Sequence, residues 1–118
     1  MPVTTVVEAA YVNNDAGTSV TSGAFTVATD DLIVVVAHCD TVDATIDVAW
    51  TISDNQTPDL TYTLIVERDG SDGDGGGVVA WYHRVVDAIV GLTITVAVSV
   101  SCDSPAIKVY SCTGYDTA

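Results

Sequence analysis

The sequence is poor in basic residues: it has three Lys and Arg in total, against sixteen Asp and Glu, and a formal net charge of −13. Three cationic side chains cannot neutralise a track of phosphates, so this count excludes a conventional nucleic-acid-binding protein. The same shortage excludes electrostatic binding to an anionic membrane surface. We therefore expect neither nucleic acid nor membrane among the partners.

Cysteines are few, and segments that would target or anchor the chain are not visible. Cys39, Cys102 and Cys112 are too few for a disulfide framework, so we expect small buried side chains. Cys102 and Cys112 flank a predicted hairpin turn that would set Cys112 opposite position 95, so no disulfide is expected between them. The first residues lack the basic and apolar segments of a secretory signal. The longest apolar run, Leu32–Ala37, is too short to cross a bilayer.

What the sequence has in quantity is β-branched residues, with 21 Val and 16 Thr among 118 positions. The acidic residues are 14 Asp and only two Glu. Asp is favoured in turns, whereas Glu favours helices. Both biases predict an all-β protein. The length fits one domain, which we expect to span residues 1–118.

Alternation of apolar and polar residues gives the clearest strands. Between Leu92 and Cys102 every even position is apolar or Cys, whereas the odd positions hold Thr, Ser or Ala, a period of two that a helix would not produce. Asp31–Cys39 and Val78–Val86 are instead apolar on both faces, as expected of strands that are central or covered by a neighbouring molecule.

Together, the turn signals and the strand patterns predict eight strands and no helix. We expect an eight-stranded antiparallel β-sandwich, either jelly-roll-like or an Ig-like Greek key. The predicted strands are Val3–Val12, Ala24–Ala28, Asp31–Cys39, Thr45–Ser53, Leu60–Arg68, Val78–Val86, Leu92–Ser101 and Ala106–Cys112.

The loop from Asp69 to Gly77 is the one motif that suggests a metal. Asp72 and Asp74, followed by glycine, resemble the core of an EF-hand calcium loop, but Gly70 stands at the first ligand position and Trp81 at that of the bidentate Glu. We therefore expect a hairpin loop. Asp69, Asp72 and Asp74 remain a weak candidate for a divalent cation.

No catalytic constellation is visible. His38 and Cys39 are adjacent on a predicted strand, so their side chains point to opposite faces and cannot share a metal. A Cys–His nucleophile using His83 has no local motif, and the acids lie almost entirely in turns rather than in convergent pairs. We expect no enzyme activity and no cofactor.

The order of several segments resembles a β-sandwich module found in virion proteins of tailed viruses, in capsid decoration and tail-associated chains. The likeness covers about residues 20 to 118, and Asp30 and an inserted Thr113 depart from its turns. The similar segments are Thr29–Val36, Asn55–Tyr62, the Trp-Tyr strand Val78–Tyr82, the Thr/Val alternation of Leu92–Val100 and the closing Val109–Asp116. The family has no catalytic residues to transfer.

This resemblance implies a capsid decoration protein that stabilises the virion head. Its partners would be the major capsid protein or other virion proteins, and it would form homo-oligomers, with a trimer favoured. Trp81, Tyr82 and Tyr110, on or beside the strands that are apolar on both faces, are the candidate contact residues. Many copies would make weak individual contacts sufficient.

The alternative is a tail-associated or adhesion module that binds a surface glycan through aromatic side chains. Trp50 argues against such a platform, because the alternation places it with the inward set. The acidity itself suggests a halophilic host: at molar salt the Debye length falls to about 3 Å, and the repulsion among Asp side chains is screened.

Overall fold

The computed structural model describes residues 5–13, 16–40, 49–68 and 77–113, and this part of the chain is all-β. Within it, no helix is long and apolar enough to cross a membrane. The strands along these residues are β1 (Thr5–Asn13), β2 (Ala16–Thr21), β3 (Phe25–Val27), β4 (Leu32–Asp40), β5 (Trp50–Asp54), β6 (Thr63–Arg68), β7 (Gly77–Arg84), β8 (Ile89–Leu92) and β9 (Ile94–Thr113).

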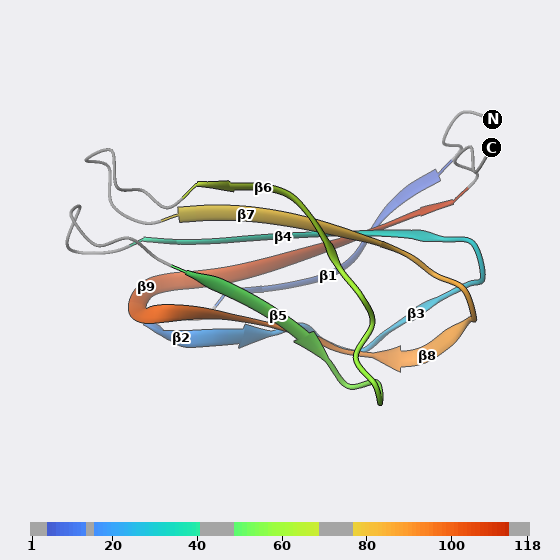
Figure 1. Ribbon diagram of the computed structural model, residues 1–118, viewed down its shortest axis with the longest axis horizontal. Helices are drawn as coiled ribbons and strands as arrows, with labels where there is room; N and C mark the ends of the chain where they lie inside the picture. Colours follow the sequence, from blue (N-terminus) through green and yellow to red (C-terminus); the bar gives the residue numbers. More distant parts are fainter. Residues whose placement is uncertain (1–4, 14–15, 41–48, 69–76, 114–118) are drawn as a thin grey trace.

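Strand β9 organises the fold, because its 20 residues serve two layers. It bends near Ser104, which has a positive φ of 50°, and Figure 1 shows the strand curling back at this bend. The first arm, up to Cys102, pairs with β2 and β5, whereas the second arm, from Ala106, pairs with β1 and β4. The predicted hairpin pairing of the two arms is therefore wrong, since each arm pairs within a different layer.

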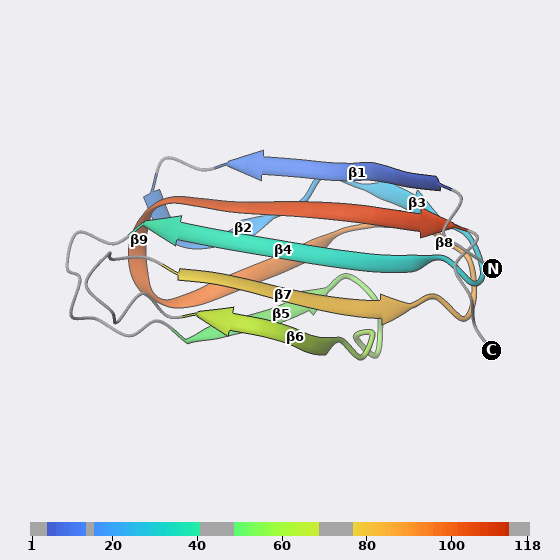
Figure 2. The ribbon, with the colours of Figure 1, turned by 90° about the horizontal axis from the view of Figure 1, so that it is seen from above.

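Five strands form the first layer, in the order β1, second arm of β9, β4, β7 and β6. They lie side by side in this order in Figure 2, and all neighbouring pairs are antiparallel. Strands β4 and β7, whose sequences are apolar on both faces, are interior strands of this layer. Strands β1 and β6 form its two edges.

The second layer consists of β2, the first arm of β9 and β5, again antiparallel. The short β3–β8 ladder continues the pairing of β2 with the first arm. Ser22 joins the two ladders: its backbone N–H donates to the Ile94 carbonyl at 2.8 Å, and its hydroxyl accepts from the Ile94 N–H at 2.9 Å. Because Ser22 is buried, this exchange satisfies polar groups where the ladder breaks.

The strand order resembles that of a jelly roll, with one exception. If β2 with β3, and β8 with the first arm of β9, are each counted as one strip, eight strips follow one another along the chain. Strips 1, 8, 3 and 6, which are β1, the second arm of β9, β4 and β7, lie side by side in one layer. Strips 2, 7 and 4, which are β2 with β3, β8 with the first arm of β9, and β5, form the other layer. This is the arrangement of a jelly roll. The fifth strip, β6, departs from this order because it pairs with β7 in the first layer. The predicted antiparallel β-sandwich is thus confirmed, and all its strips but β6 follow the jelly-roll order.

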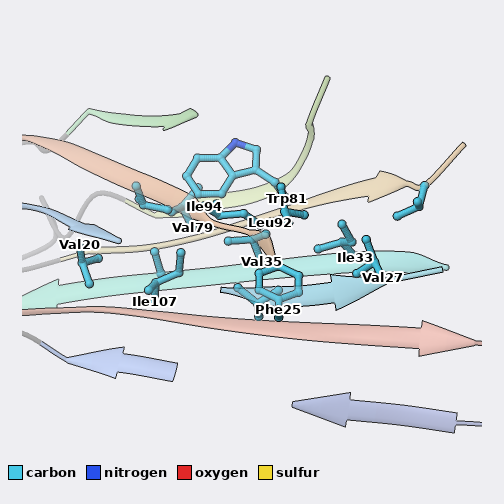
Figure 3. Packing of buried hydrophobic residues seen from close by; sticks show 14 residues of the cluster. Val20, Phe25, Val27, Ile33, Val35, Val79, Trp81, Leu92, Ile94 and Ile107 are labelled. Atoms are coloured by element: carbon cyan, nitrogen blue, oxygen red, sulfur yellow. The ribbon is translucent and has the colours of Figure 1, made fainter. Parts of the chain in front are cut away.

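The core lies between the two layers, and Figure 3 shows its side chains converging from both. Ile33 and Val35 of β4 meet Ile94 and Val96 of β9, and all four are almost completely buried. The alternation predicted for Leu92–Cys102 is confirmed, because the even positions up to Val98 are buried and Thr93, Thr95 and Ala97 are only partly so.

Two strands were not predicted. Residues 13–17 and 87–91 carry Asn, Asp and Gly, which are turn residues, yet β2 begins at Ala16 and β8 at Ile89. Gly17 and Gly91 have φ values of +146° and +74°, so glycine permits the chain to turn and pair within the same few residues. The predicted strand Thr45–Ser53 is observed from Trp50, and residues 41–48 lie outside the described part.

Candidate interaction surface

The outer faces of the two layers differ in chemistry. On the second layer, Thr95 lies opposite Thr21 on one side and Ser53 on the other. The hydroxyls of Thr21 and Thr95 are 2.8 Å apart and hydrogen-bond to each other. This face is therefore a band of small hydroxyl side chains suited to water.

On the first layer, aromatic and aliphatic residues occupy the outer face instead. Residues directly opposite each other in neighbouring strands share a face. Val34 of β4 lies opposite Tyr110 of β9 on one side and Tyr82 of β7 on the other. The next residue beyond Tyr110 is Glu8 of β1, and the next beyond Tyr82 is Thr63 of β6.

A second row of the same face runs parallel to the first. It consists of Tyr11, Lys108, Val36, Ala80 and Val66. The Lys108 ammonium lies 5.6 Å from the ring centre of Tyr11 and 5.8 Å from that of Tyr110. These are cation–π distances, so the charge is held among aromatic rings rather than away from them.

Glu8 pairs with Lys108 at 3.2 Å. The hydrogen bond from Lys108 to Glu8 and the charge of that carboxylate raise the pKa of Lys108 above its ordinary value. The ion pair is exposed, and such pairs contribute little to stability. Its consequence is electrostatic: Lys108 neutralises the charge of Glu8, the one acid in these two rows.

The two rows that flank these carry the remaining basic side chains. Arg68 lies opposite Val78, and Arg84 lies opposite Leu32. All three Lys and Arg residues of a chain with net charge −13 therefore lie on one face. We call this surface the apolar face, and it comprises Val6, Tyr11, Val34, Val36, Val66, Val78, Tyr82 and Tyr110 together with Glu8, Lys108, Arg68 and Arg84.

Much of the apolar face is open to solvent in the single chain. Val6 is 59% exposed, Tyr11 and Val66 are each 52% exposed and Tyr82 is 40% exposed. Single exposed apolar residues are ordinary on protein surfaces, but contiguous ones across several strands mark interaction sites.

The three predicted contact residues separate in the structure. Tyr82 and Tyr110 lie on the apolar face, on either side of Val34. Trp81 does not: it lies opposite Val35 on the inner face, is 6% exposed and packs in the core. The reason is strand parity, because consecutive residues of β7 point to opposite faces. Lys108 was not among the predicted contact residues. It lies two residues before Tyr110 on β9, so its side chain points to the same face.

A separate, concave site lies where β7 leads into β8. This groove has a volume of about 330 Å³ and is lined by residues that include Gln56, Pro58, Leu60, His83, Asp87 and Ile89. The His83 ring nitrogen Nδ1 lies 2.7 Å from the Thr61 carbonyl, which fixes the ring against the wall.

The wall of the groove depends on Asp54. Its carboxylate accepts hydrogen bonds from the Gln56 N–H at 2.8 Å, the Leu60 N–H at 3.0 Å and the Tyr62 hydroxyl at 2.8 Å. Burial and the hydrogen bond to Asp54 raise the pKa of Tyr62, so its hydroxyl stays protonated as a donor. Asp54 thus organises the segment between β5 and β6.

No metal centre emerges from the described residues, which contain no group of three or more His, Cys, Asp or Glu placed to hold an ion. The candidate cation ligands Asp69, Asp72 and Asp74 lie outside the described part. His38 is exposed and Cys39 is buried, as expected of neighbours on a strand. Comparison of the chain with family models, with curated proteins and with solved structures finds no match.

Proposed function

We propose that the chain is a virion structural protein, a capsid decoration protein of a tailed virus with a halophilic host. Its apolar face would bind neighbouring copies of the same chain, as a trimer, and the assembled unit would sit on the capsid surface. The observation that carries the proposal is the composition of that face, which holds every Lys and Arg of the chain and, across its rows, one acid.

Charge explains why this face suits contact between copies. Two exposed like charges about 5 Å apart repel by roughly 1 kcal/mol in water, and turns rich in Asp would bring many such pairs together. The apolar face avoids this repulsion because Glu8 is paired with Lys108 and Asp30 is paired with Arg84 at 2.6 Å. Burying Tyr82, Val66 and Tyr11 there would also remove apolar area from water, at about 25 cal/mol per Å².

The sequence order that resembles virion modules and the jelly-roll strand order support the capsid role. A decoration protein acts in many copies, each weakly bound. Quantitative mass spectrometry of purified particles should therefore find tens to hundreds of copies per particle, and particles that lack the protein should break at lower temperature. A count of one to six copies would contradict decoration and assign the chain to a tail tip.

The alternative, an adhesion module that binds a surface glycan, is favoured by one observation, the groove beside His83. Its volume of about 330 Å³ matches small-ligand sites, and it combines Gln56 and Asp87, which can hydrogen-bond hydroxyls, with apolar Leu60 and Ile89. Retention on a glycan array at micromolar concentration, lost in His83→Ala and kept in Tyr82→Ala, would establish this role. Absence of retention would contradict glycan binding in this groove.

A further inference from the structure

Two of the three cysteines meet in the structure, although they are far apart in the sequence. Cys39 and Cys102 are 3% and 2% exposed and pack together with Val98 in a small cluster separate from the main core. Partly buried Trp50 and Val100 enclose them. Both thiols are reduced, and Cys112, the third cysteine, is not part of this cluster.

The two cysteines belong to different layers of the sandwich. Cys39 lies near the end of β4 in the five-stranded layer, and Cys102 ends the first arm of β9, where it pairs with Gly17 of β2 in the other layer. The following residues, Asp40 and Asp103, are backbone partners, which holds the two cysteine positions side by side at the β9 bend. Figures 1 and 2 show β4 ending beside this bend.

Each of the two thiols has a backbone partner, Gly77 for Cys39 and Val100 for Cys102. The Cys102 thiol donates to the Val100 carbonyl at 3.4 Å. Burial, and next the hydrogen bond with Cys102, raise the pKa of Cys39 to about 12. The two cysteines therefore share one buried apolar cluster, and no third ligand is placed there to complete a metal site among the described residues.

We infer that Cys39 and Cys102 are a modification site, at which a small-molecule disulfide oxidises them to a disulfide bond that joins the two layers. The inference does not depend on the virion proposal. The cysteines are 63 positions apart, so the bond would close a long loop and constrain the unfolded chain strongly.

The reaction balances with oxidised glutathione as the oxidant. One protein thiolate attacks a glutathione sulfur, forms a mixed disulfide and expels one glutathione thiolate. The second protein thiolate then attacks the protein sulfur of the mixed disulfide, which forms the Cys39–Cys102 bond and expels the second glutathione thiolate. Two protein thiols are oxidised, one small disulfide is reduced to two thiols, and the two protons lost by the protein go to the expelled thiolates.

The raised pKa of Cys39 affects the rate of this reaction rather than its product. Because the attacking species is a thiolate, oxidation through Cys39 should be slow at neutral pH and should accelerate as the pH rises toward the raised pKa of Cys39. A loop of this length predicts a melting temperature higher by roughly 10 °C in the oxidised protein.

Trypsin tests the inference directly, because its cleavage after Arg68, Arg84 and Lys108 places each cysteine on a different peptide. Cys39 falls in residues 1–68, Cys102 in residues 85–108 and Cys112 in residues 109–118. The folded full chain is incubated with oxidised glutathione, alkylated, digested and analysed by mass spectrometry. A sample in urea shows that the oxidant is active, and Cys112→Ser serves as the matched control.

We expect the peptides 1–68 and 85–108 to be joined in the folded protein and in Cys112→Ser, lighter by two hydrogens than the two free peptides. Oxidation should raise the melting temperature in both. The inference is overturned if the folded protein keeps both thiols alkylatable at pH 9 while the urea sample oxidises. It is also overturned if the main link involves 109–118, or if the bond lowers the melting temperature.

Discussion

Replacing Asp54 by Asn should destabilise the protein far more than the loss of one charge explains. The Asp54 carboxylate accepts from three donors, the N–H groups of Gln56 and Leu60 and the hydroxyl of Tyr62. An Asn side chain has one oxygen, so its NH₂ group would face the Leu60 N–H, which is only a donor, and the Tyr62 hydroxyl, which could accept from the NH₂ but would lose the acceptor of its own proton. All three hydrogen bonds are partly buried, which makes the unpaired groups costly.

The expected cost follows from these contacts. A hydrogen bond to a charged group is worth about 1.5–3 kcal/mol, and a buried donor left unsatisfied costs about 1–3 kcal/mol. Because Asn keeps one of the bonds, we expect Asp54→Asn to lower the free energy of unfolding by about 2–4 kcal/mol. The loop that lines the groove should loosen as well, since Asp54 ties its backbone at Gln56 and Leu60.

Urea denaturation measures this cost, with Asp59→Asn as the control because it removes the same charge from an exposed site in the same loop. Tyr62→Phe removes only the donor, and the double mutant with Asp54→Asn isolates the coupling of the pair. We expect a coupling energy of about 1 kcal/mol or more. The reasoning is refuted if Asp54→Asn and Asp59→Asn cost the same within about 0.5 kcal/mol.

Three further predictions concern the core, pH and salt. Leu92→Ala should cost about 2–5 kcal/mol in urea denaturation because Leu92 is fully buried, whereas Val90→Ala in the same strand, 84% exposed, should cost under about 0.5 kcal/mol; equal costs would contradict the burial. The Cys39 thiol has its pKa raised to about 12 from 9.0 by burial and by Cys102, so its contribution to stability is complete below pH 9 and is lost as pH rises from 9 to 12. The free energy of unfolding should then fall by up to about 1.4 kcal/mol per pH unit from this group, and Cys39→Ser should flatten the fall. Thermal melts between about 0.05 and 3 M salt should show the melting temperature rising with salt, and full cooperative folding at the lowest salt would count against a halophilic source.

Local pattern was sufficient to predict the fold class and most strands. The period of two from Leu92 onward requires a sheet with one inward face, and the buried positions follow it. The same reasoning failed for Trp81. Val78–Val86 is apolar on both faces, so its pattern does not indicate which set of alternate residues points inward. It also failed for β2, where Val20 is the only large apolar side chain among small and polar ones.

The candidate sites depend on long-range pairing that no local pattern contains. Tyr82 and Tyr110 flank Val34 only because β7 and the second arm of β9 are both neighbours of β4. Cys39 meets Cys102 only because β9 bends and passes between layers. The predicted hairpin at this bend gave the wrong neighbours for Cys102 and Cys112, since a hairpin and a crossing between layers share the same turn residues.

Sedimentation equilibrium in high salt shows whether the apolar face joins copies of this chain. The wild-type protein should have a mass about three times the 12.2 kDa of the single chain. Tyr82→Asp, which places a charge on the apolar face, should weaken the assembly by about a hundredfold or more, to a monomer. Thr51→Asp, which adds the same charge to the outer face of the other layer, should leave the trimer intact. A wild-type monomer, or equal masses for the two variants, would contradict the account.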